Sequence, residues 1–430
     1  MRYLSTRGQS EPVALDAALR AGLAPDGGLY VPERIPRLDG LTLQPEAGLP
    51  ATARQWLAPF FAGSPLSAEL AAITREALDP DLPVTGLEPG WSWLLELFHG
   101  PTAAFKDFAA RFLAACLGRL RSDGDPTQTV LVATSGDTGA AVAAAFHRRP
   151  GFRVVILYPD GKVSGRQAHQ LGAFGDNVVA FRVRGDFDDC QRLVKRALND
   201  DRLAGLALTS ANSISIGRLL PQISYYAHSV TALHEQIDTP VNLIVPTGNL
   251  GNALAAIMAR AMGLPIDEIV LATNANRTLP DFFSGQDYRG RPGLATLANA
   301  MDVGDPSNFE RLAWLYRDAD LRASSIRALS TDDDAIRSTI QRVWQDFKLA
   351  VCPHTACALD ALDRLRRSGD RRPWLIAATA HAAKFDNVVE PIIRCRIEPP
   401  PALAELLQRA SRAEPMAADY SSLRSRLAAL

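Results

Sequence analysis

The distribution of apolar residues divides the chain into two parts of different character. Residues 1–95 carry aliphatic side chains at helical spacing, as in 13–21 and 66–78, and turns rich in Pro and Gly such as PDGGLYVPERIP interrupt them. This spacing is typical of helices that bury one face. We therefore expect residues 1–95 to form a mainly helical N-terminal section.

From residue 129 onward, short apolar runs alternate with helical stretches. TVLVAT leads into GDTGAAVAAAFHRR, NVVAFRVR leads into DFDDCQRLVKRAL, and VNLIVPTG leads into NALAAIMARAMG. Further apolar runs are FRVVILYP, EIVLATN and WLIAAT. Apolar runs of this length between helices indicate strands of parallel sheets with helices on both faces. The expected fold class is therefore α/β, and no repeat of fixed period is visible.

Composition narrows the class of protein. The chain has 430 residues, too many for one average domain, and 47% of them are hydrophobic. Its 46 basic and 47 acidic residues give a net charge of -1, without the basic excess that nucleic acid or an anionic membrane selects. No apolar stretch approaches the roughly 18 residues of a membrane span, and the first residues lack the apolar core of a secretory signal. Five scattered cysteines fit a reducing compartment, so we expect a cytoplasmic protein.

The first candidate site is the segment TSGDTG (134–139), between a strand and an Ala-rich helix. Such a loop presents backbone N–H groups at a helix N-terminus, where the dipole and the donors together stabilise an anion. Ser135 and Thr138 add hydroxyl groups. A simple turn that uses Gly for tightness explains the segment equally well.

The second candidate is PTGNLGN (246–252), again between a strand and a helix. Two glycines and two asparagines in five residues are more than a turn requires, and Gly allows the backbone to approach a ligand closely. The segment has neither the GKS or GKT ending of a P-loop nor the GxGxxG pattern of dinucleotide sites. We favour a phosphate-binding loop over a plain turn.

The third candidate is Lys106 in HGPTAAFKDF. Only five of the basic residues are lysines, and this one stands between Phe105 and Phe108 in an apolar run. Desolvation by aromatic neighbours lowers the pKa of an amine and makes it the nucleophile that Schiff-base chemistry requires. A lysine that extends from an apolar helix face to solvent is the structural alternative.

Other residues have less specific surroundings. Thr379 ends an apolar strand, where open α/β sheets bind ligands. His354 lies between Cys352 and Cys357, but the spacing matches no common zinc motif, so we expect no metal and favour packing at a helix start. His381 either lines a site or has a structural role.

The remaining lysines and one acidic group complete the polar candidates. Lys162 in PDGKVS either reaches an anionic ligand or is simply exposed. Lys195 and Lys348 are expected in solvent. The acidic group at 186–189 is expected to cap the helix that follows it.

Taken together, these segments resemble the threonine synthase family of pyridoxal-phosphate enzymes. The resemblance covers nearly the whole chain, and HGPTAAFKDF and GLAPDGGLYVP are highly specific to the family. The other matching segments, in the same order as in the family, are STRG, TSGDTGAAV, ILYPDGKVS, NSISIGR, PTGNLGN, ATNAN, AMDVGDPSN, PHTA and TAHAAKF.

The resemblance implies a fold of type II, like that of the tryptophan synthase β subunit. Two parallel-type α/β lobes would sandwich pyridoxal 5'-phosphate, with the mainly helical section at the N-terminus. The expected division is 1–95 for that section, 96–128 with 200–430 for the large cofactor-binding lobe, and 129–199 for the small lobe that carries SGDTG.

The resemblance also implies roles for single residues. Lys106 is the expected catalytic residue and binds the cofactor through a Schiff base, with Asp137 near the cofactor's 3′ oxygen and Thr379 at its pyridine nitrogen. The expected phosphate loop consists of Gly248, Asn249, Leu250, Gly251 and Asn252. The expected substrate-binding residues are Ser135, Thr138, Lys162, Asn212, Ser213 and Arg218.

Three residues depart from the family pattern. Leu250 replaces the usual Phe of the phosphate loop, and Ala378 and Ala382 replace a Gly and a Pro around Thr379. These changes affect packing and the path of the loop beside Thr379, and they remove no group that the chemistry needs.

The activity that the resemblance implies is the last step of threonine biosynthesis, conversion of O-phospho-L-homoserine and water to L-threonine and phosphate. The expected partner is this small substrate, not nucleic acid or a membrane, and the chain is expected to be a monomer or homodimer. Two alternatives stay open. One is a pyridoxal-phosphate lyase or dehydratase of the same fold that acts on serine, threonine or another phosphorylated amine, and the other is a non-catalytic ligand-binding descendant, which the presence of Lys106 disfavours.

Overall fold

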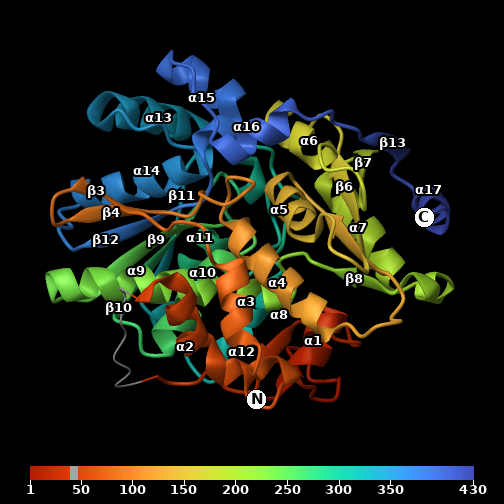
Figure 1. Ribbon diagram of the computed structural model, residues 1–430. Helices are drawn as coiled ribbons and strands as arrows, with labels where there is room; N and C mark the ends of the chain where they lie inside the picture. The colour runs from red at the N-terminus through yellow and green to blue at the C-terminus, as the bar shows by residue number, and fades with distance from the viewer. Residues whose placement is uncertain (39–46) are drawn as a thin grey trace.

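The structure is a computed structural model that describes residues 1–38 and 47–430 (Figure 1). The strands in these residues are β1 (Tyr3–Ser5), β2 (Tyr30–Pro32), β3 (Val84–Glu88), β4 (Ser92–Glu96), β5 (Gln128–Ala133), β6 (Phe152–Pro159), β7 (Val178–Arg184), β8 (Leu208–Ser210), β9 (Val241–Pro246), β10 (Ile266–Thr273), β11 (Ile326–Ser330), β12 (Trp374–Ala378) and β13 (Glu414–Ala417).

The α-helices of the described residues are α1 (Leu15–Ala21), α2 (Leu49–Phe61), α3 (Leu70–Ala77), α4 (Lys106–Leu120), α5 (Asp137–Phe146), α6 (Gly165–Gly172), α7 (Phe187–Leu198), α8 (Ile216–Leu219), α9 (Gln222–Ile237), α10 (Gly251–Ala261), α11 (Thr278–Phe283), α12 (Phe309–Leu315), α13 (Asp333–Phe347), α14 (Pro353–Arg367), α15 (Asp386–Ile393), α16 (Pro401–Gln408) and α17 (Tyr420–Ala428). Short 3-10 helices are η2 (Pro65–Ser67), η3 (Asp201–Leu206), η4 (Asn299–Met301), η5 (Leu321–Ala323) and η6 (Ala382–Phe385).

Two sheets organise the described part of the chain. The larger sheet has the order β11-β10-β9-β12-β4-β3 and is parallel except for the antiparallel edge strand β3. The smaller sheet has the order β13-β7-β6-β5-β8 and is parallel throughout. Every residue of β9 is buried, as strands covered by helices on both faces require. The α/β class with parallel sheets is thus confirmed.

Helices cover both faces of each sheet. On the larger sheet, α14 contacts β9, β10 and β12, while α9 and α10 pack against β9 from the other side. On the smaller sheet, α5 and α7 contact β5 and β6. Figure 1 shows the two sheets on opposite sides of the molecule with α4 and α5 between them, and α4 and α5 pack on each other.

The sheets draw strands from outside the segments expected for each lobe. β8 and β13 complete the smaller sheet although both lie outside 129–199, and the larger sheet includes β3, which lies within 1–95, and β4, all but the last residue of which lies there. These strands are short, and β13 lies near the C-terminal end of the chain. We propose that each sheet with its covering helices forms one lobe, with these strands added to the expected boundaries.

Local signals fix several element ends. Asp186 caps α7: its side chain accepts from the Asp189 N–H (2.8 Å), and the Asp189 carboxylate accepts from the Asp186 N–H (3.0 Å). This reciprocal pair satisfies donors at the helix start, as expected for the acidic group.

Over residues 1–38 and 47–430, no helix has the length and apolar composition that a membrane crossing requires.

Candidate active site

A pocket lies where the carboxyl ends of strands from both sheets come together. Its wall includes the segments that follow β5, β8 and β9, the first residue of α4 and the residue after β12. Ligands of open α/β sheets bind at this end of the strands. The pocket brings together all the predicted site residues except Lys162, namely Lys106, Ser135, Asp137, Thr138, Asn212, Ser213, Arg218, Gly248, Asn249, Leu250, Gly251, Asn252 and Thr379.

Backbone pairing fixes the position of Lys106, the first residue of α4. The Phe105 N–H donates to the Thr379 carbonyl (2.9 Å), and the His381 N–H donates to the Ala103 carbonyl (3.1 Å). These bonds tie the start of α4 to the end of β12, although the two lie far apart in the sequence. Any side chain at position 106 is therefore held at the carboxyl edge of the larger sheet.

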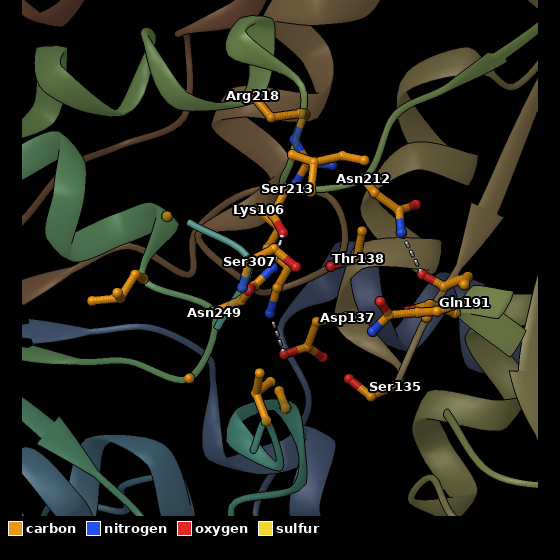
Figure 2. Close-up of a pocket in the computed structure, with 18 of the residues that line it drawn as sticks. Lys106, Ser135, Asp137, Thr138, Gln191, Asn212, Ser213, Arg218, Asn249 and Ser307 are labelled. Atoms are coloured by element: carbon orange, nitrogen blue, oxygen red, sulfur yellow. Dashed lines mark hydrogen bonds and ion pairs between the residues drawn. The ribbon is translucent and has the colours of Figure 1, made fainter. Parts of the chain in front are cut away.

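The Lys106 amine points into the pocket, toward Asp137 (Figure 2). Its side chain is only 15% exposed, and Nζ lies 4.8 Å from the centroid of the Phe105 ring. Burial lowers the pKa of Lys106, and the neighbouring cation Lys384 lowers it further, although Asp137 opposes the shift. The sequence argument for a desolvated amine beside an aromatic ring therefore agrees with the geometry.

Asp137, the first residue of α5, is the hub of a buried polar network. Its Oδ2 lies 3.5 Å from Lys106 Nζ, while its Oδ1 accepts from Lys384 Nζ (2.9 Å) and from Gln167 Nε2 (2.9 Å). Burial alone would raise the pKa of Asp137, but the ammonium groups of Lys384 and Lys106 outweigh it and hold that pKa well below its usual range. The carboxylate is thus ionised and has no proton to donate.

Lys384 is the principal residue that the sequence reasoning missed. It is 0% exposed, and its Nζ donates to the Thr102 carbonyl (2.7 Å) as well as to Asp137. A signal was present, because Lys384 is one of only five lysines and stands in an apolar segment next to Phe385. The same reasoning that singled out Lys106 applies to it.

The loop between β9 and α10 is shaped for close approach to a ligand. A Cβ added at Gly248 would lie 2.6 Å from Cα of Met301, so only Gly fits there without moving the backbone. Leu250 stands immediately before α10 in the left-handed conformation, with φ of 63°. The N-terminus of α10 therefore opens onto the pocket, where its free N–H groups favour an anion.

Asn249 ties this loop to two neighbouring segments. Its Nδ2 donates to Ser213 Oγ (2.6 Å), and its Oδ1 accepts from the Ser307 N–H (2.6 Å). Its carbonyl accepts from Asn308 Nδ2 (2.9 Å), and Asn308 is held in turn by the buried guanidinium of Arg311 (2.7 Å). The side chains of Asn249 and Ser213 thus brace the loop as well as line the pocket.

Asn252 lies in the first turn of α10, and its side-chain amide has a paired oxygen and an unpaired nitrogen. The hydroxyls of Tyr225 and Tyr226 both donate to its Oδ1, each at 2.7 Å. Its buried Nδ2 has no hydrogen-bond partner among the residues that the structure describes. A buried, oriented donor in a pocket wall suits an acceptor on a ligand.

The segment after β8 supplies the cationic wall of the pocket. Arg218 is buried, its Nη1 donates to the Ala211 carbonyl (2.5 Å), and burial lowers its pKa to about 10, so it stays charged. Asn212 Nδ2 donates to the Ala133 carbonyl (3.2 Å), which links this segment to the end of β5 (Figure 2). Arg218 Nε and Asn212 Oδ1 are buried without a partner in residues 1–38 and 47–430.

Lys162 lies apart from the other predicted substrate-binding residues. It is exposed in the turn after β6, beside Gly161 at a φ of 70°, and it does not line the pocket. The motif ILYPDGKVS placed it after a strand, but that turn projects into solvent. Lys195, expected in solvent, is exposed and stands at the pocket with Gln191 of the same helix, α7.

The cysteines and histidines around the start of α14 pack as a helix start. The Cys352 sulfur accepts from the Thr355 N–H (3.4 Å), and the Cys357 thiol donates to the Pro353 carbonyl (3.4 Å). Among the described residues, no group of three or more His, Cys, Asp or Glu side chains could hold a metal ion. His354, however, does line the pocket.

His381 does not line the pocket. Its Nδ1 accepts from the Ala383 N–H (3.2 Å) at the start of η6, and its ring packs edge-on against Phe98. Of the two roles considered for His381, lining a site or supporting the structure, its surroundings match the structural one.

Three family models match the chain. One described as "Pyridoxal-phosphate dependent enzyme" matches residues 85–379, one described as "Threonine synthase N terminus" matches 2–78, and one described as "Threonine synthase, C-terminal" matches 355–426. The first of these models covers the loops TSGDTG and PTGNLGN and also Lys106. Lys384 falls in the third.

Individual relatives agree over the full length. The threonine synthase of Haemophilus influenzae is 37% identical over 99% of this chain and 99% of its own length. The crystal structure of threonine synthase from Escherichia coli superposes with a TM-score of 0.92 at 35% identity, covering 100% of both chains. The pyridoxal-phosphate-bound threonine synthase from Brucella melitensis superposes with a TM-score of 0.88 at 32% identity, covering 99% of this chain and 98% of that one.

Proposed function

Since this chain belongs to the threonine synthase family of pyridoxal-phosphate-dependent enzymes, we propose that Lys106 binds the cofactor and moves the protons of the substrate. The activity is that of the family, conversion of O-phospho-L-homoserine and water to L-threonine and phosphate, so the chain is a carbon–oxygen lyase. Its cofactor is pyridoxal 5'-phosphate.

The residues of the pocket fit this cofactor at both of its ends. At the start of α10, a Cβ added at Gly251 would have no atom closer than 3.8 Å, and the backbone N–H groups there suit a phosphate. The unpaired Nδ2 of Asn252 supplies another donor there. At the opposite end, the Lys106 amine is a buried nucleophile for the cofactor's aldehyde.

The observation that carries the assignment is the contrast between the two buried lysines. Lys384 Nζ is held by two bonds, to Asp137 and to the Thr102 carbonyl, and the side chain is 0% exposed, so it can neither reach a ligand nor leave its place. Lys106 Nζ has one long contact of 3.5 Å and faces the pocket. Lys106 is therefore the amine free to form a bond with the cofactor.

Bound pyridoxal phosphate supplies the electron sink that makes the substrate's Cα and Cβ protons acidic. The chain supplies the base and the orientation. Burial lowers the pKa of Lys106, which favours the neutral amine that can accept the substrate's Cα proton and then a Cβ proton. Asp137 keeps that amine in place and, by its charge, stabilises the ammonium that each transfer creates.

Arg218 and its neighbours bind the substrate's phosphate. A guanidinium presents several donors in one plane and suits a phosphate dianion better than an ammonium does. Arg218 has a buried Nε with no partner within the described ranges, and the hydroxyls of Ser135 and Thr138 line the same pocket. Asn212 offers its unpaired Oδ1 to the substrate's donors. Thr379 follows β12, is 5% exposed and lines the pocket, and its hydroxyl would hold the cofactor's ring nitrogen.

Borohydride reduction of the cofactor-loaded protein tests this assignment. Reduction fixes the cofactor on the lysine that holds it, and peptide mapping is expected to find it on Lys106 alone. Lys106→Ala should lack the yellow colour of the bound cofactor, whereas Lys348→Ala, at an exposed lysine of α13's C-terminal end, should keep it. Label on Lys384 or on any other lysine would overturn the assignment.

We further propose that the enzyme works in the cytoplasm, as a monomer or homodimer, without nucleic acid or a membrane as partner. The net charge of -1 gives the chain no overall basic excess for either, and all five cysteines are free thiols, four of them buried. Native mass measurement of the full chain, with and without cofactor, checks the oligomeric state.

A further inference from the structure

His354 is a buried residue of the pocket that has no role in the mechanism proposed above. It is the second residue of α14, only 3% exposed, and its ring packs on Phe385 with the centroids 4.9 Å apart. It lines the same pocket as Lys106 and Asp137, and it interacts electrostatically with both. A histidine in such a place either has all its ring nitrogens paired or offers one to a ligand.

The hydrogen bonds of His354 determine where its proton is. The Ala300 backbone N–H lies 3.1 Å from Nε2, and because an amide N–H can only donate, Nε2 must carry the lone pair. Burial lowers the pKa of His354 to about 4, so the ring is neutral at neutral pH. A neutral ring that accepts at Nε2 carries its hydrogen on Nδ1.

That Nδ1–H is an unpaired donor. Nδ1 is buried and has no hydrogen-bond partner in the part of the chain that the structure describes. The bond at Nε2 and the contact with Phe385 hold the ring, so Nδ1 cannot rotate toward another protein acceptor. A buried donor without a partner destabilises a protein by about 1–3 kcal/mol, and such a group is usually matched by a ligand or water.

The state of the Asp137 carboxylate indicates which kind of acceptor the His354 Nδ1–H would pair with. Asp137 is ionised, and both of its oxygens already accept from Lys106, Lys384 and Gln167. A carboxylate in this state repels an anionic oxygen placed beside it, and Lys384 Nζ is already engaged by two acceptors. An acceptor oxygen bound next to the Lys106 amine therefore needs a donor from another residue. His354, whose Nδ1–H is unpaired, lines the same pocket as Lys106.

We propose that the His354 Nδ1–H donates a hydrogen bond to the 3′ oxygen of the cofactor's pyridine ring, the oxygen adjacent to the carbon that Lys106 binds. The proposal rests on the proposed function, because it assumes that Lys106 holds the cofactor. His354 is a positioning residue in this scheme: it orients the ring and offsets the repulsion between that oxygen and Asp137. Substrate oxygens are the competing acceptor, and the test separates the two.

The test is a cycle of one side-chain change and one cofactor change. Full-length protein freed of cofactor is titrated with pyridoxal 5'-phosphate and with 3-deoxypyridoxal 5'-phosphate, which lacks only the ring oxygen. The unmodified protein is expected to bind the deoxy analogue about tenfold more weakly, as loss of one hydrogen bond to a charged acceptor predicts. In His354→Phe, which keeps a ring but no donor, the two ligands should bind within about twofold of each other.

His228→Phe is the matched control. His228 is a partly buried histidine of α9 whose Nδ1 pairs with Thr52 Oγ1 (3.2 Å), and it does not line the pocket. This variant should retain the tenfold difference between the ligands. A tenfold difference that persists in His354→Phe overturns the proposal, and so does a His354→Phe variant that loses affinity only for O-phospho-L-homoserine.

A measurement on the unmodified protein keeps the proposal testable if His354→Phe fails to fold. In protein with ¹⁵N-labelled histidine, the His354 signals are expected to show Nδ1 protonated, and Nδ1 should shift on addition of pyridoxal phosphate but not of the deoxy analogue. A proton on Nε2, or equal shifts with both ligands, contradicts it. If borohydride mapping finds the cofactor on Lys106 while the cycle shows no coupling, the proposed function stands and only this inference fails.

Discussion

Replacing Lys384 with methionine removes one cation from the buried network and keeps most of the side-chain volume. In the unmodified protein, Lys384 Nζ donates to Asp137 Oδ1 at 2.9 Å and to the Thr102 carbonyl at 2.7 Å. After the change, Asp137 keeps only the Gln167 amide and the long contact to Lys106. The stability of the protein then depends on how well one distant ammonium compensates a buried carboxylate.

The expected loss of stability is large because water cannot reach the buried Asp137 carboxylate to replace the missing ammonium. Breaking a buried ion pair by removing one partner typically lowers the free energy of unfolding by about 3–5 kcal/mol, and we expect Lys384→Met to fall in this range at neutral pH. The effect depends on pH with a definite sign. The pKa of Asp137 is lowered in the folded protein, so its stabilisation is fully present above the unfolded pKa of about 4 and is lost as the pH falls below it. The difference between the two proteins should therefore shrink in acid.

Urea unfolding of the cofactor-free protein at several pH values measures this difference. Lys348→Met is the control, because Lys348 is exposed and its Nζ contacts only the Gln345 carbonyl (3.3 Å) among the described residues. That variant should stay within about 0.5 kcal/mol of the unmodified protein. If Lys384→Met at neutral pH is no less stable than Lys348→Met, then Asp137 does not depend on Lys384 and the network described above is wrong.

Three further outcomes are expected. Gly248→Ala, whose Cβ would lie 2.6 Å from Met301 Cα, should weaken binding of pyridoxal phosphate at least tenfold in an absorbance titration, whereas Gly165→Ala, with no atom within 4 Å of the added Cβ, should bind it normally. Asn252→Asp keeps the acceptor for its two tyrosines but replaces the free donor by a negative charge, so it too should bind the cofactor at least tenfold more weakly; equal affinity would remove Asn252 from the phosphate site. Because burial lowers the pKa of His354 to about 4 while an unfolded histidine titrates near 6.5, the unmodified protein should lose on the order of 3 kcal/mol of stability between pH 6.5 and 4 from this residue, and urea unfolding of His354→Phe should show a correspondingly flatter pH profile.

The sequence predicted the site wherever a function leaves a local signature. A lysine among aromatic residues, a Gly- and Asn-rich loop between a strand and a helix, and a hydroxyl at a strand's end all lie in one pocket, because parallel strands bring their carboxyl ends to the same edge. Likewise the acidic residues at 186–189 predicted the cap of α7, since a capping box involves only neighbouring residues.

What the sequence did not predict depends on contacts between distant segments. Nothing near Lys384 in the sequence indicates that it meets Asp137, and nothing near His354 indicates that the Ala300 N–H fixes its tautomer. The strand β13 pairs with β7 in the smaller sheet although the two lie far apart in the sequence. Lys162 is exposed in the turn after β6 and does not line the pocket, so its contact with the substrate stays a prediction.

In the proposed mechanism, the two lysines beside Asp137 have complementary roles. Asp137 raises the pKa of Lys106 and so opposes the loss of the proton that a nucleophile or base must give up, while burial lowers that pKa. Lys384 balances the carboxylate, and its positive charge lowers the pKa of Lys106, so the amine can lose its proton without leaving an unpaired buried charge. Each proton that Lys106 then accepts is again compensated by Asp137 at 3.5 Å. An intact buried ion pair often adds little stability over apolar side chains of the same size, so we propose that this pair serves to let Lys106 change its charge at small electrostatic cost.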